Sequence, residues 1–265
     1  MSNKPRVAVF KLTSCDGCQL QLLDAEEALL VLASEIDIVY FREATSREEP
    51  GPFDLSIIEG SVSEPWQLDE VKKIRSASSL VVAIGACATT GGIQALRNLA
   101  DIDAIVSSVY PSPEYIHSLR QSTPVSDHIE VDLELSGCPV DRGQLLGAVA
   151  SLLRGAMPHV SRAPVCVECK RRGYACVVVT RGEACLGPIT ATGCGALCPA
   201  FGRGCYGCFG PSDGLNTAAM RTLLQMQGQS EESIASKLRF INCWAPELRE
   251  EATSTSRSAA HASHS

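Results

Sequence analysis

Cysteine thiols are the side chains of this sequence with the clearest potential chemistry. The chain has 265 residues and 13 cysteines, and eight of these crowd into the stretch from Cys166 to Cys208. Thiols that pack as small apolar residues account for one or two cysteines, such as Cys243, but not for so dense a run. The N-terminus has no secretory signal pattern, so the crowding indicates bound metal and not disulfide bonds.

Four cysteines in the first half each follow a predicted strand: Cys15, Cys18, Cys87 and Cys138. The carboxyl ends of parallel strands gather at one edge of a sheet, so these four thiols are expected to converge there. Three interpretations of the spacing stay open. A [4Fe–4S] cluster accepts scattered cysteines and the Cys138-Pro139 pair, a structural zinc site accepts four thiolates, and a redox dithiol needs only Cys15 and Cys18.

Eight cysteines in the second half are enough for two four-thiolate sites. Sequential quartets are the simplest partition, and an interleaved arrangement stays open because spacing alone does not exclude it. Two zinc sites are the alternative to two clusters, although three four-cysteine sites in one chain favour electron transfer. The sequential quartets are Cys166, Cys169, Cys176 and Cys185, followed by Cys194, Cys198, Cys205 and Cys208.

The first half alternates short apolar strands with helices, and these elements must position the early cysteines. Apolar strands of about five residues separated by helices predict a parallel sheet covered on both faces. We therefore expect an α/β fold, a flavodoxin-like doubly wound parallel sheet. Strands are predicted over 6–12, 37–41, 54–58, 80–84 and 128–135, and helices over 16–33, 65–77 and 141–153.

A second, smaller domain is expected to follow the sheet. Residues 1–157 are predicted to form the flavodoxin-like domain, and residues 158–249 a cysteine-rich iron–sulfur domain with a helical stretch over 214–239. The cysteine-rich stretch has little apolar periodicity, so bound metal is expected to organise it. The Ser/Ala-rich residues 250–265 are expected to be a disordered tail.

Composition excludes several other functions. The 23 basic and 30 acidic residues give a net charge of −7, which argues against nucleic acid as a partner. No apolar run reaches the ~18 residues of a membrane span. No Ser-His-Asp or Cys-His arrangement is visible, so we expect no catalytic residue in this chain. The missing signal pattern predicts a cytoplasmic location.

The cysteine motifs resemble those of the small, electron-transferring subunits of nickel–iron hydrogenases. The resemblance covers about residues 5–211 and rests on three stretches in the same order as in that family. These are Thr13-Ser14-Cys15-Asp16-Gly17-Cys18-Gln19, Ile84-Gly85-Ala86-Cys87-Ala88 and Gly137-Cys138-Pro139, followed by Cys185-Leu186-Gly187-Pro188, Cys194 and Gly204-Cys205-Tyr206-Gly207-Cys208.

The resemblance implies three [4Fe–4S] clusters and assigns their ligands. Cys15, Cys18, Cys87 and Cys138 would hold the proximal cluster. Cys194, Cys198, Cys205 and Cys208 would hold the medial cluster, and Cys166, Cys169, Cys176 and Cys185 the distal one. Membrane-associated members carry a twin-arginine signal, a histidine in place of Cys166 and only three medial cysteines. The differences in this chain are similar to the cytoplasmic, NAD(P)-linked group of the sulfhydrogenase delta type.

The same resemblance implies a role in an assembly. The nickel–iron site would lie on the hydrogenase large subunit, and FAD and NAD(P) on further flavin-binding and iron–sulfur subunits. This chain would carry electrons between them in a hetero-oligomer. The quinone-reductase relatives are a poorer match, since they use an adjacent Cys-Cys pair and lack the second cysteine domain. The alternatives are a zinc-stabilised interaction module without a redox role and a standalone thiol redox protein.

Overall fold

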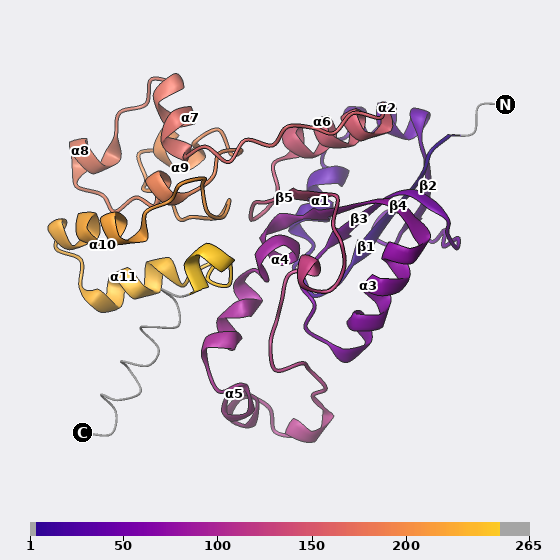
Figure 1. The fold of residues 1–265 in the computed structure, drawn as a ribbon, viewed down its shortest axis with the longest axis horizontal. Helices are drawn as coiled ribbons and strands as arrows, with labels where there is room; N and C mark the ends of the chain where they lie inside the picture. The colour runs from indigo at the N-terminus through magenta and orange to yellow at the C-terminus, as the bar shows by residue number, and fades with distance from the viewer. Residues whose placement is uncertain (1–3, 250–265) are drawn as a thin grey trace.

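The structure is a computed structural model that describes residues 4–249. A sheet half comes first and a cysteine-rich half follows, joined by an irregular segment after the last helix of the sheet half (Figure 1). The predicted tail, residues 250–265, lies outside the described residues. The strands are β1 (Arg6–Lys11), β2 (Asp37–Phe41), β3 (Phe53–Glu59), β4 (Ser78–Ile84) and β5 (Leu133–Leu135).

The sheet of the described residues is wholly parallel, with strand order β2-β1-β3-β4-β5. This is the flavodoxin-like order, and it confirms the predicted fold class. The order also turns the carboxyl ends of all the strands to one edge. Its helices are α1 (Gly17–Leu23), α2 (Glu27–Glu35), α3 (Pro65–Ala77), α4 (Gly85–Thr90), α5 (Ile102–Val109) and α6 (Arg142–Leu153), with 3-10 turns η1 (Ile93–Leu99), η2 (Pro113–Tyr115) and η3 (Val125–Asp127).

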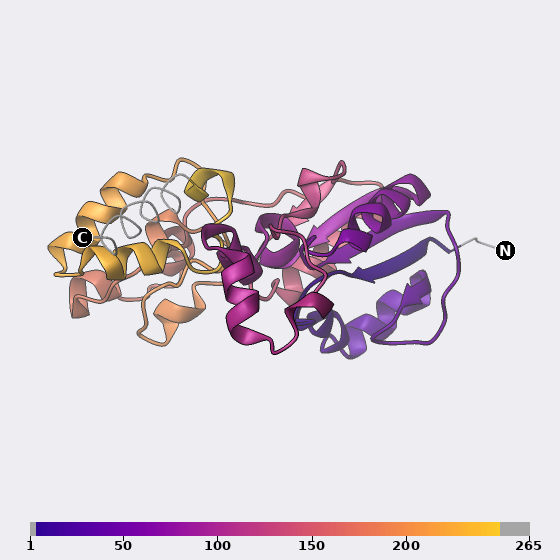
Figure 2. The same cartoon turned by 90° about the horizontal axis from the view of Figure 1, so that it is seen from below.

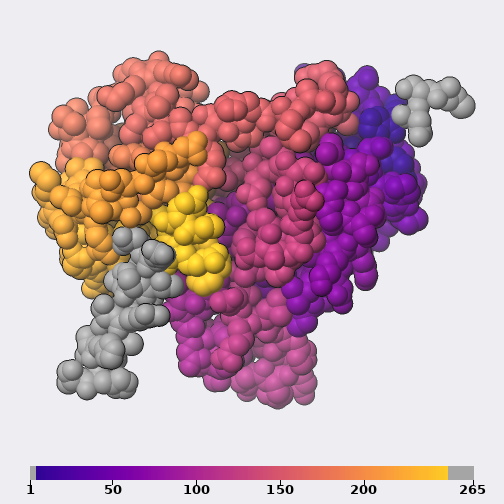
Figure 3. Space-filling model, viewed as in Figure 1, coloured from indigo at the N-terminus to yellow at the C-terminus, as the bar shows by residue number. Residues whose placement is uncertain are grey.

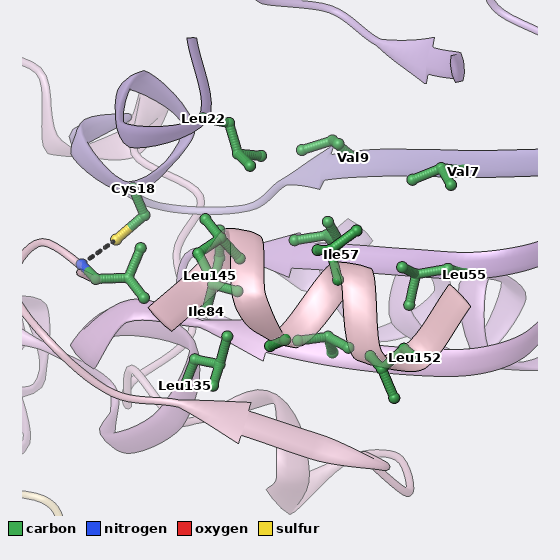
Figure 4. Packing of buried hydrophobic residues seen from close by; sticks show 14 of the residues in the cluster. Val7, Val9, Cys18, Leu22, Leu55, Ile57, Ile84, Leu135, Leu145 and Leu152 are labelled. Atoms are coloured by element: carbon green, nitrogen blue, oxygen red, sulfur yellow. Dashed lines mark hydrogen bonds between the residues drawn. The ribbon is translucent and has the colours of Figure 1, made fainter. Parts of the chain in front are cut away.

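Alternate residues of each strand pack against opposite faces of the sheet, as a strand's two-residue period requires. Val7 and Val9 of β1 face α1 and α6, where they pack in one core with Leu22 and Leu145 (Figure 4). The intervening Ala8 and Phe10 pack in a second core, with Val71 and Ile74 of α3. Burial on both faces explains why the strands read as continuous apolar runs.

Three predicted elements differ from the structure. The predicted helix over 16–33 is two helices, because Glu26 has a left-handed backbone (φ 46°) that interrupts it. The predicted strand over 128–135 pairs with β4 only over Leu133–Leu135. The predicted helical stretch over 214–239 is also two helices, with Gly228 at φ 75° in the turn between them.

The cysteine-rich half is built from short helices around the thiols. A separate apolar core packs Leu186 and Ile189 of the first part against Met220, Leu224, Ile234 and Leu238 of the last two helices. These elements form the end of the molecule remote from the N-terminal strands (Figures 1 and 2). They are α7 (Val165–Arg171), α8 (Val177–Arg181), η4 (Gly187–Ile189), α9 (Leu197–Ala200), α10 (Thr217–Met226) and α11 (Glu231–Leu238).

The last described residues return to the sheet half. Cys243 and Trp244 pack with Ala95 and Leu99 of η1, and Figure 3 shows this yellow segment lying between the two halves. The contact ties the cysteine-rich half to the edge of the sheet where the early cysteines lie. Within residues 4–249, no helix combines the length and apolar character that crossing a membrane requires.

Candidate metal centres

The four early cysteines lie together beyond the carboxyl ends of three strands. We call them the proximal group: Cys15 after β1, Cys18 in the first turn of α1, Cys87 in α4 after β4, and Cys138 after β5. Burial, with the nearby Cys138, Cys15 and Glu59, raises the pKa of the Cys87 thiol to about 11. Burial also raises the pKa of Cys18, and the neighbouring Glu59, Cys87 and Cys138 add to the shift. The structure thus brings all four predicted thiols into one neighbourhood.

Glycines keep space open beside the proximal sulfurs. Gly85 has φ 82°, and a Cβ atom placed on it would lie 2.3 Å from Cys18 Sγ. Gly92 has φ 63°, and its Cβ would lie 2.7 Å from Cys87 Sγ. Any larger residue would therefore collide with a sulfur and adopt a strained backbone. The two glycines thus leave a space beside the sulfurs, a cradle that would fit a metal–sulfur group bound by these thiols.

Hydrogen bonds hold two of the proximal sulfurs, those of Cys18 and Cys87. The Val140 N–H donates to Cys18 Sγ at 3.4 Å. The Cys87 thiol lies 3.4 Å from Gln94 Oε1, and Gln94 Nε2 donates to the Thr13 carbonyl at 3.0 Å. Backbone N–H groups aimed at sulfur stabilise the thiolate form and tune a bound metal centre.

Glu59 is a buried carboxylate directly behind the proximal group. It ends β3 and accepts hydrogen bonds from the Cys18 N–H at 3.1 Å and from Gln19 Nε2 at 2.7 Å. Burial raises the pKa of the Glu59 carboxyl. From the sequence, Glu59 is a strand-end carboxylate that either lies near the partner interface or is solvated. The structure buries it behind Cys18, because the sequence does not show whether a strand-end side chain turns inward.

Four further thiols gather around α7 and α8, and we call them the distal group: Cys166, Cys169, Cys176 and Cys185. Burial raises the pKa of the Cys166 thiol, and Cys185, Cys169 and Cys176 raise it further. A Cβ atom on Gly187 would lie 3.3 Å from Cys185 Sγ and 3.6 Å from Cys166 Sγ, so these two sulfurs flank one glycine. Cys185 is buried, whereas Cys176 is exposed to solvent.

The last four thiols lie between the other two groups, and we call them the medial group: Cys194, Cys198, Cys205 and Cys208. Burial, with nearby Cys194, Cys198 and Cys138, raises the pKa of the Cys208 thiol to about 12. Burial likewise raises the pKa of the Cys205 thiol to about 12. The Gly207 N–H, which donates to its sulfur at 3.4 Å, has the smaller, opposite effect on this pKa. Glu168 of α7 holds the loop before α9 by accepting from the Gly193 and Ala196 N–H groups.

The three groups are joined in series. Cys208 of the medial group neighbours Cys138 of the proximal group. On the other side, the Cys205 N–H donates to Cys185 Sγ of the distal group at 3.2 Å. Sequential quartets suit this order, in which Cys205 lies where the medial and distal groups meet.

Cys243 is the one cysteine outside these groups. It is fully buried against Ala95 and Trp244, and burial raises the pKa of its thiol to about 11. Within residues 4–249, no three His, Cys, Asp or Glu side chains are close enough to hold a single metal ion. The thiols of each group are therefore not drawn together as closely as a single ion such as zinc requires, and sets of four thiols in proteins also hold the larger iron–sulfur clusters.

The chain is similar to known proteins over most of its length. The family described as NADH ubiquinone oxidoreductase, 20 Kd subunit, matches residues 15–152, the part that carries the proximal group. Sulfhydrogenase 2 subunit delta of Pyrococcus furiosus is 35% identical over 239 residues, covering 90% of this chain and 100% of that protein. A subunit of the F420-non-reducing hydrogenase vhu of Methanocaldococcus jannaschii is 31% identical and covers 89% of this chain and 93% of that one.

Solved structures show the same likeness. A chain of an NAD+-reducing [NiFe]-hydrogenase in the H2-reduced state is 27% identical with a TM-score of 0.54, covering 59% of this chain and 94% of that chain. An actinobacterial-type NiFe-hydrogenase of Ralstonia eutropha H16 shares the fold over 97% of this chain and 91% of that chain, with a TM-score of 0.57 at 14% identity. The chain therefore belongs to the family of small, electron-transferring subunits of nickel–iron hydrogenases.

Proposed function

We propose that this chain holds three [4Fe–4S] clusters and relays electrons within a cytoplasmic hydrogenase. The partners would be a large subunit with the nickel–iron site and a module of flavin- and NAD(P)-binding and iron–sulfur subunits. The names of the relatives, a sulfhydrogenase subunit and a subunit from an NAD+-reducing hydrogenase, support this choice. We further propose residues 1–157 and 158–249 as the two domains.

One observation carries the proposal: twelve thiols form three groups of four that meet in a line. Cys138 neighbours Cys208, and the Cys205 N–H contacts Cys185 Sγ. A zinc-stabilised scaffold needs four thiols at each site but gains nothing from a chain of neighbouring sites. Electron transfer requires such a chain, because the rate of each step falls steeply with distance.

The chain's own residues would hold, orient and shield the clusters. Bound at each group, a [4Fe–4S] cluster supplies a one-electron site whose potential depends on nearby hydrogen bonds, charge and exposure. Burial disfavours the free thiolates, since it raises the pKa of Cys18, Cys205 and Cys208. Metal binding reverses this, because it stabilises the deprotonated sulfur and couples cluster insertion to folding.

We propose that the large subunit packs beside the proximal group on α5 and the turns around it. This helix is mostly apolar, yet it buries no residue against the rest of the chain. Its neighbour η1 reaches the group through Gln94, which contacts Cys87. Exposed apolar residues of this kind mark interaction surfaces. They are Ile93, Ile105, Val109, Tyr110, Tyr115 and Ile116.

Metal analysis tests the proposal. Iron, acid-labile sulfide and zinc are measured per chain on protein purified without oxygen. About twelve irons with matching sulfide are expected for three [4Fe–4S] clusters. About three zinc ions per chain without sulfide would contradict the electron-transfer proposal and indicate a structural scaffold.

A further inference from the structure

The surface over the distal group is basic, in a chain that is acidic as a whole. Between Cys166 and Cys208 the acidic residues are Glu168 and Glu183, whereas the net charge of the chain is −7. Glu168 already accepts two backbone hydrogen bonds. The basic residues of this stretch are all exposed, and we call them the basic face: Lys170, Arg171, Arg172, Arg181 and Arg203.

None of the described ion pairs involves a cation of the basic face, although Glu168 lies near Arg172. The residues the structure describes form ion pairs such as Arg75–Asp132 and Arg162–Glu247, and all of these pairs lie outside residues 166–208. Arg172 instead lies over the backbone at Gly195, and Arg181 donates to the Gly202 carbonyl at 3.1 Å. These contacts hold the two guanidinium groups on either side of α9.

Exposed apolar side chains stand on or next to the elements that carry the cations. Val179 of α8 is 83% exposed, and Phe201 and Leu197 of the α9 region are 76% and 59% exposed. Phe201 precedes Gly202, the residue whose carbonyl Arg181 binds, so the apolar residues and the cations share one surface. An apolar centre with a charged rim is the usual anatomy of a protein-binding surface.

The basic face lies where electrons would leave the chain. Cys176 of the distal group is exposed and caps the N-terminus of α8, the helix of Val179 and Arg181. In Figure 1 the helices α7, α8 and α9 lie in the half of the molecule away from the sheet, together with α10 and α11. A protein seated on this surface would therefore contact the distal group and not the proximal one.

We propose that the basic face is the docking surface for an electron-transfer partner whose own surface is rich in carboxylates around an apolar centre. The inference rests on the proposed function and names the chemistry of the partner at the outer end of the relay. Opposite charges would steer the partner and fix its orientation, and the apolar residues would exclude water where the redox centres approach. A partner with a basic surface would be repelled.

A matched set of variants tests this in the purified hydrogenase complex. Arg171→Glu combined with Arg203→Glu reverses two charges of the basic face and replaces no thiol. Arg203 lies near the Cys198 thiol, so the iron and sulfide assay checks that the medial group is intact. Lys72→Glu, at an exposed position of α3 in the sheet half, is the control for a charge reversal away from the basic face. The probe is an acidic plant-type [2Fe–2S] ferredoxin, and the readout is the KM for its hydrogen-dependent reduction at low and high salt.

Zero-length carbodiimide cross-linking tests the same surface in the assembled complex. This reagent joins a lysine amine to a carboxylate only when the two are in contact. Lys170 is the one amine of the basic face, so it should be linked to an Asp or Glu of a partner subunit where such a subunit already occupies the face. Lys72 and Lys73 of α3 report the background reaction.

A rise of about tenfold in KM at low salt for the double variant, lost at high salt and absent in Lys72→Glu, supports the proposal. Cross-linking of Lys170 to a partner carboxylate supports it equally. The proposal is overturned if KM is unchanged and Lys170 is cross-linked to partner carboxylates no more often than Lys72. Iron and sulfide are assayed on every variant, so failure of the clusters is recognised separately as failure of the proposed function.

Discussion

The side chains of Thr90 and Asn242, 152 positions apart in the sequence, meet in a hydrogen bond of 2.6 Å. Thr90 ends the short helix that carries Cys87. Asn242 Nδ2 also donates to the Gly207 carbonyl at 2.7 Å, between Cys205 and Cys208. One buried side chain thus connects the proximal and medial groups.

Replacing Asn242 with Ala should disturb the medial group. The change leaves the buried Thr90 hydroxyl and the Gly207 carbonyl without this partner, at a cost of about 1–3 kcal/mol. We expect a lower thermal midpoint and an altered electron paramagnetic resonance spectrum of the reduced protein. Asn98→Ala is the control, because Asn98 makes two hydrogen bonds to the Ser122 backbone at 2.8 Å. Equal spectral changes in both variants would contradict the bridging role.

Replacing Gly85 with Ala should remove the metal of the proximal group alone. The new Cβ would lie 2.3 Å from Cys18 Sγ, so sulfur and metal cannot keep their places. We expect a loss of about four of about twelve irons per chain. Gly155→Ala controls for backbone strain, since Gly155 has φ 74° but nothing within 4 Å of its Cβ position. Full iron in Gly85→Ala would show that the cradle has no role in metal binding.

Cys243 should differ from the other twelve cysteines. It is buried against Ala95 and Trp244 and belongs to none of the three groups. Cys243→Ala should therefore keep all the iron and lose about 1–2 kcal/mol of stability through the small cavity. Cys208→Ala should lose iron, because it removes one of four medial thiols. Metal analysis and thermal unfolding measured on both variants separate the two roles, and iron loss in Cys243→Ala would refute this assignment.

His128 should make stability depend on pH. Burial lowers the pKa of its imidazole, whose Nε2 lies 2.8 Å from Thr123 Oγ1. In the unfolded chain the His128 imidazole has a pKa of about 6.5. As the pH falls, it therefore binds a proton in the unfolded chain before it does so in the folded protein. Stability should therefore fall as the pH drops below that value toward the folded pKa. The effect is modest, because solvent reaches part of the ring.

Thermal midpoints at about pH 5.5 and about pH 7.5, on either side of the unfolded-state value, measure this dependence. His128→Gln should reduce the difference between the two midpoints. His159→Gln changes an exposed histidine and should leave the difference as it is. A difference that persists unchanged in His128→Gln would assign the pH dependence to other groups.

Much of the fold could be predicted because the pattern is local. Residues 37–41 and 65–77 are predicted and observed with the same bounds, since their apolar runs and flanking residues mark both ends. The break at Glu26 could not be predicted, because no Gly or Pro marks it. The turn at Gly228 could have been, since glycine commonly follows a helix end.

The candidate site was likewise predictable from the sequence only in part. The cysteines are visible in sequence because their type and spacing are rare. Their partners Gln94 and Asn242 are not, because amides are common and these two act through long-range contacts to Thr13 and Thr90. Glu59 is a similar case, since only the packed structure turns it toward Cys18. The assignment of the thiols to three clusters stays a prediction.

The place of Asn242 in the chain has a consequence for biosynthesis. A ribosome completes the proximal thiols at Cys138 and all twelve grouped thiols at Cys208, before Asn242 has been added. The bridge from Thr90 to Gly207 therefore closes only after all twelve grouped thiols have been added. Until that point the growing chain lacks this hydrogen-bonded link between the proximal and medial groups.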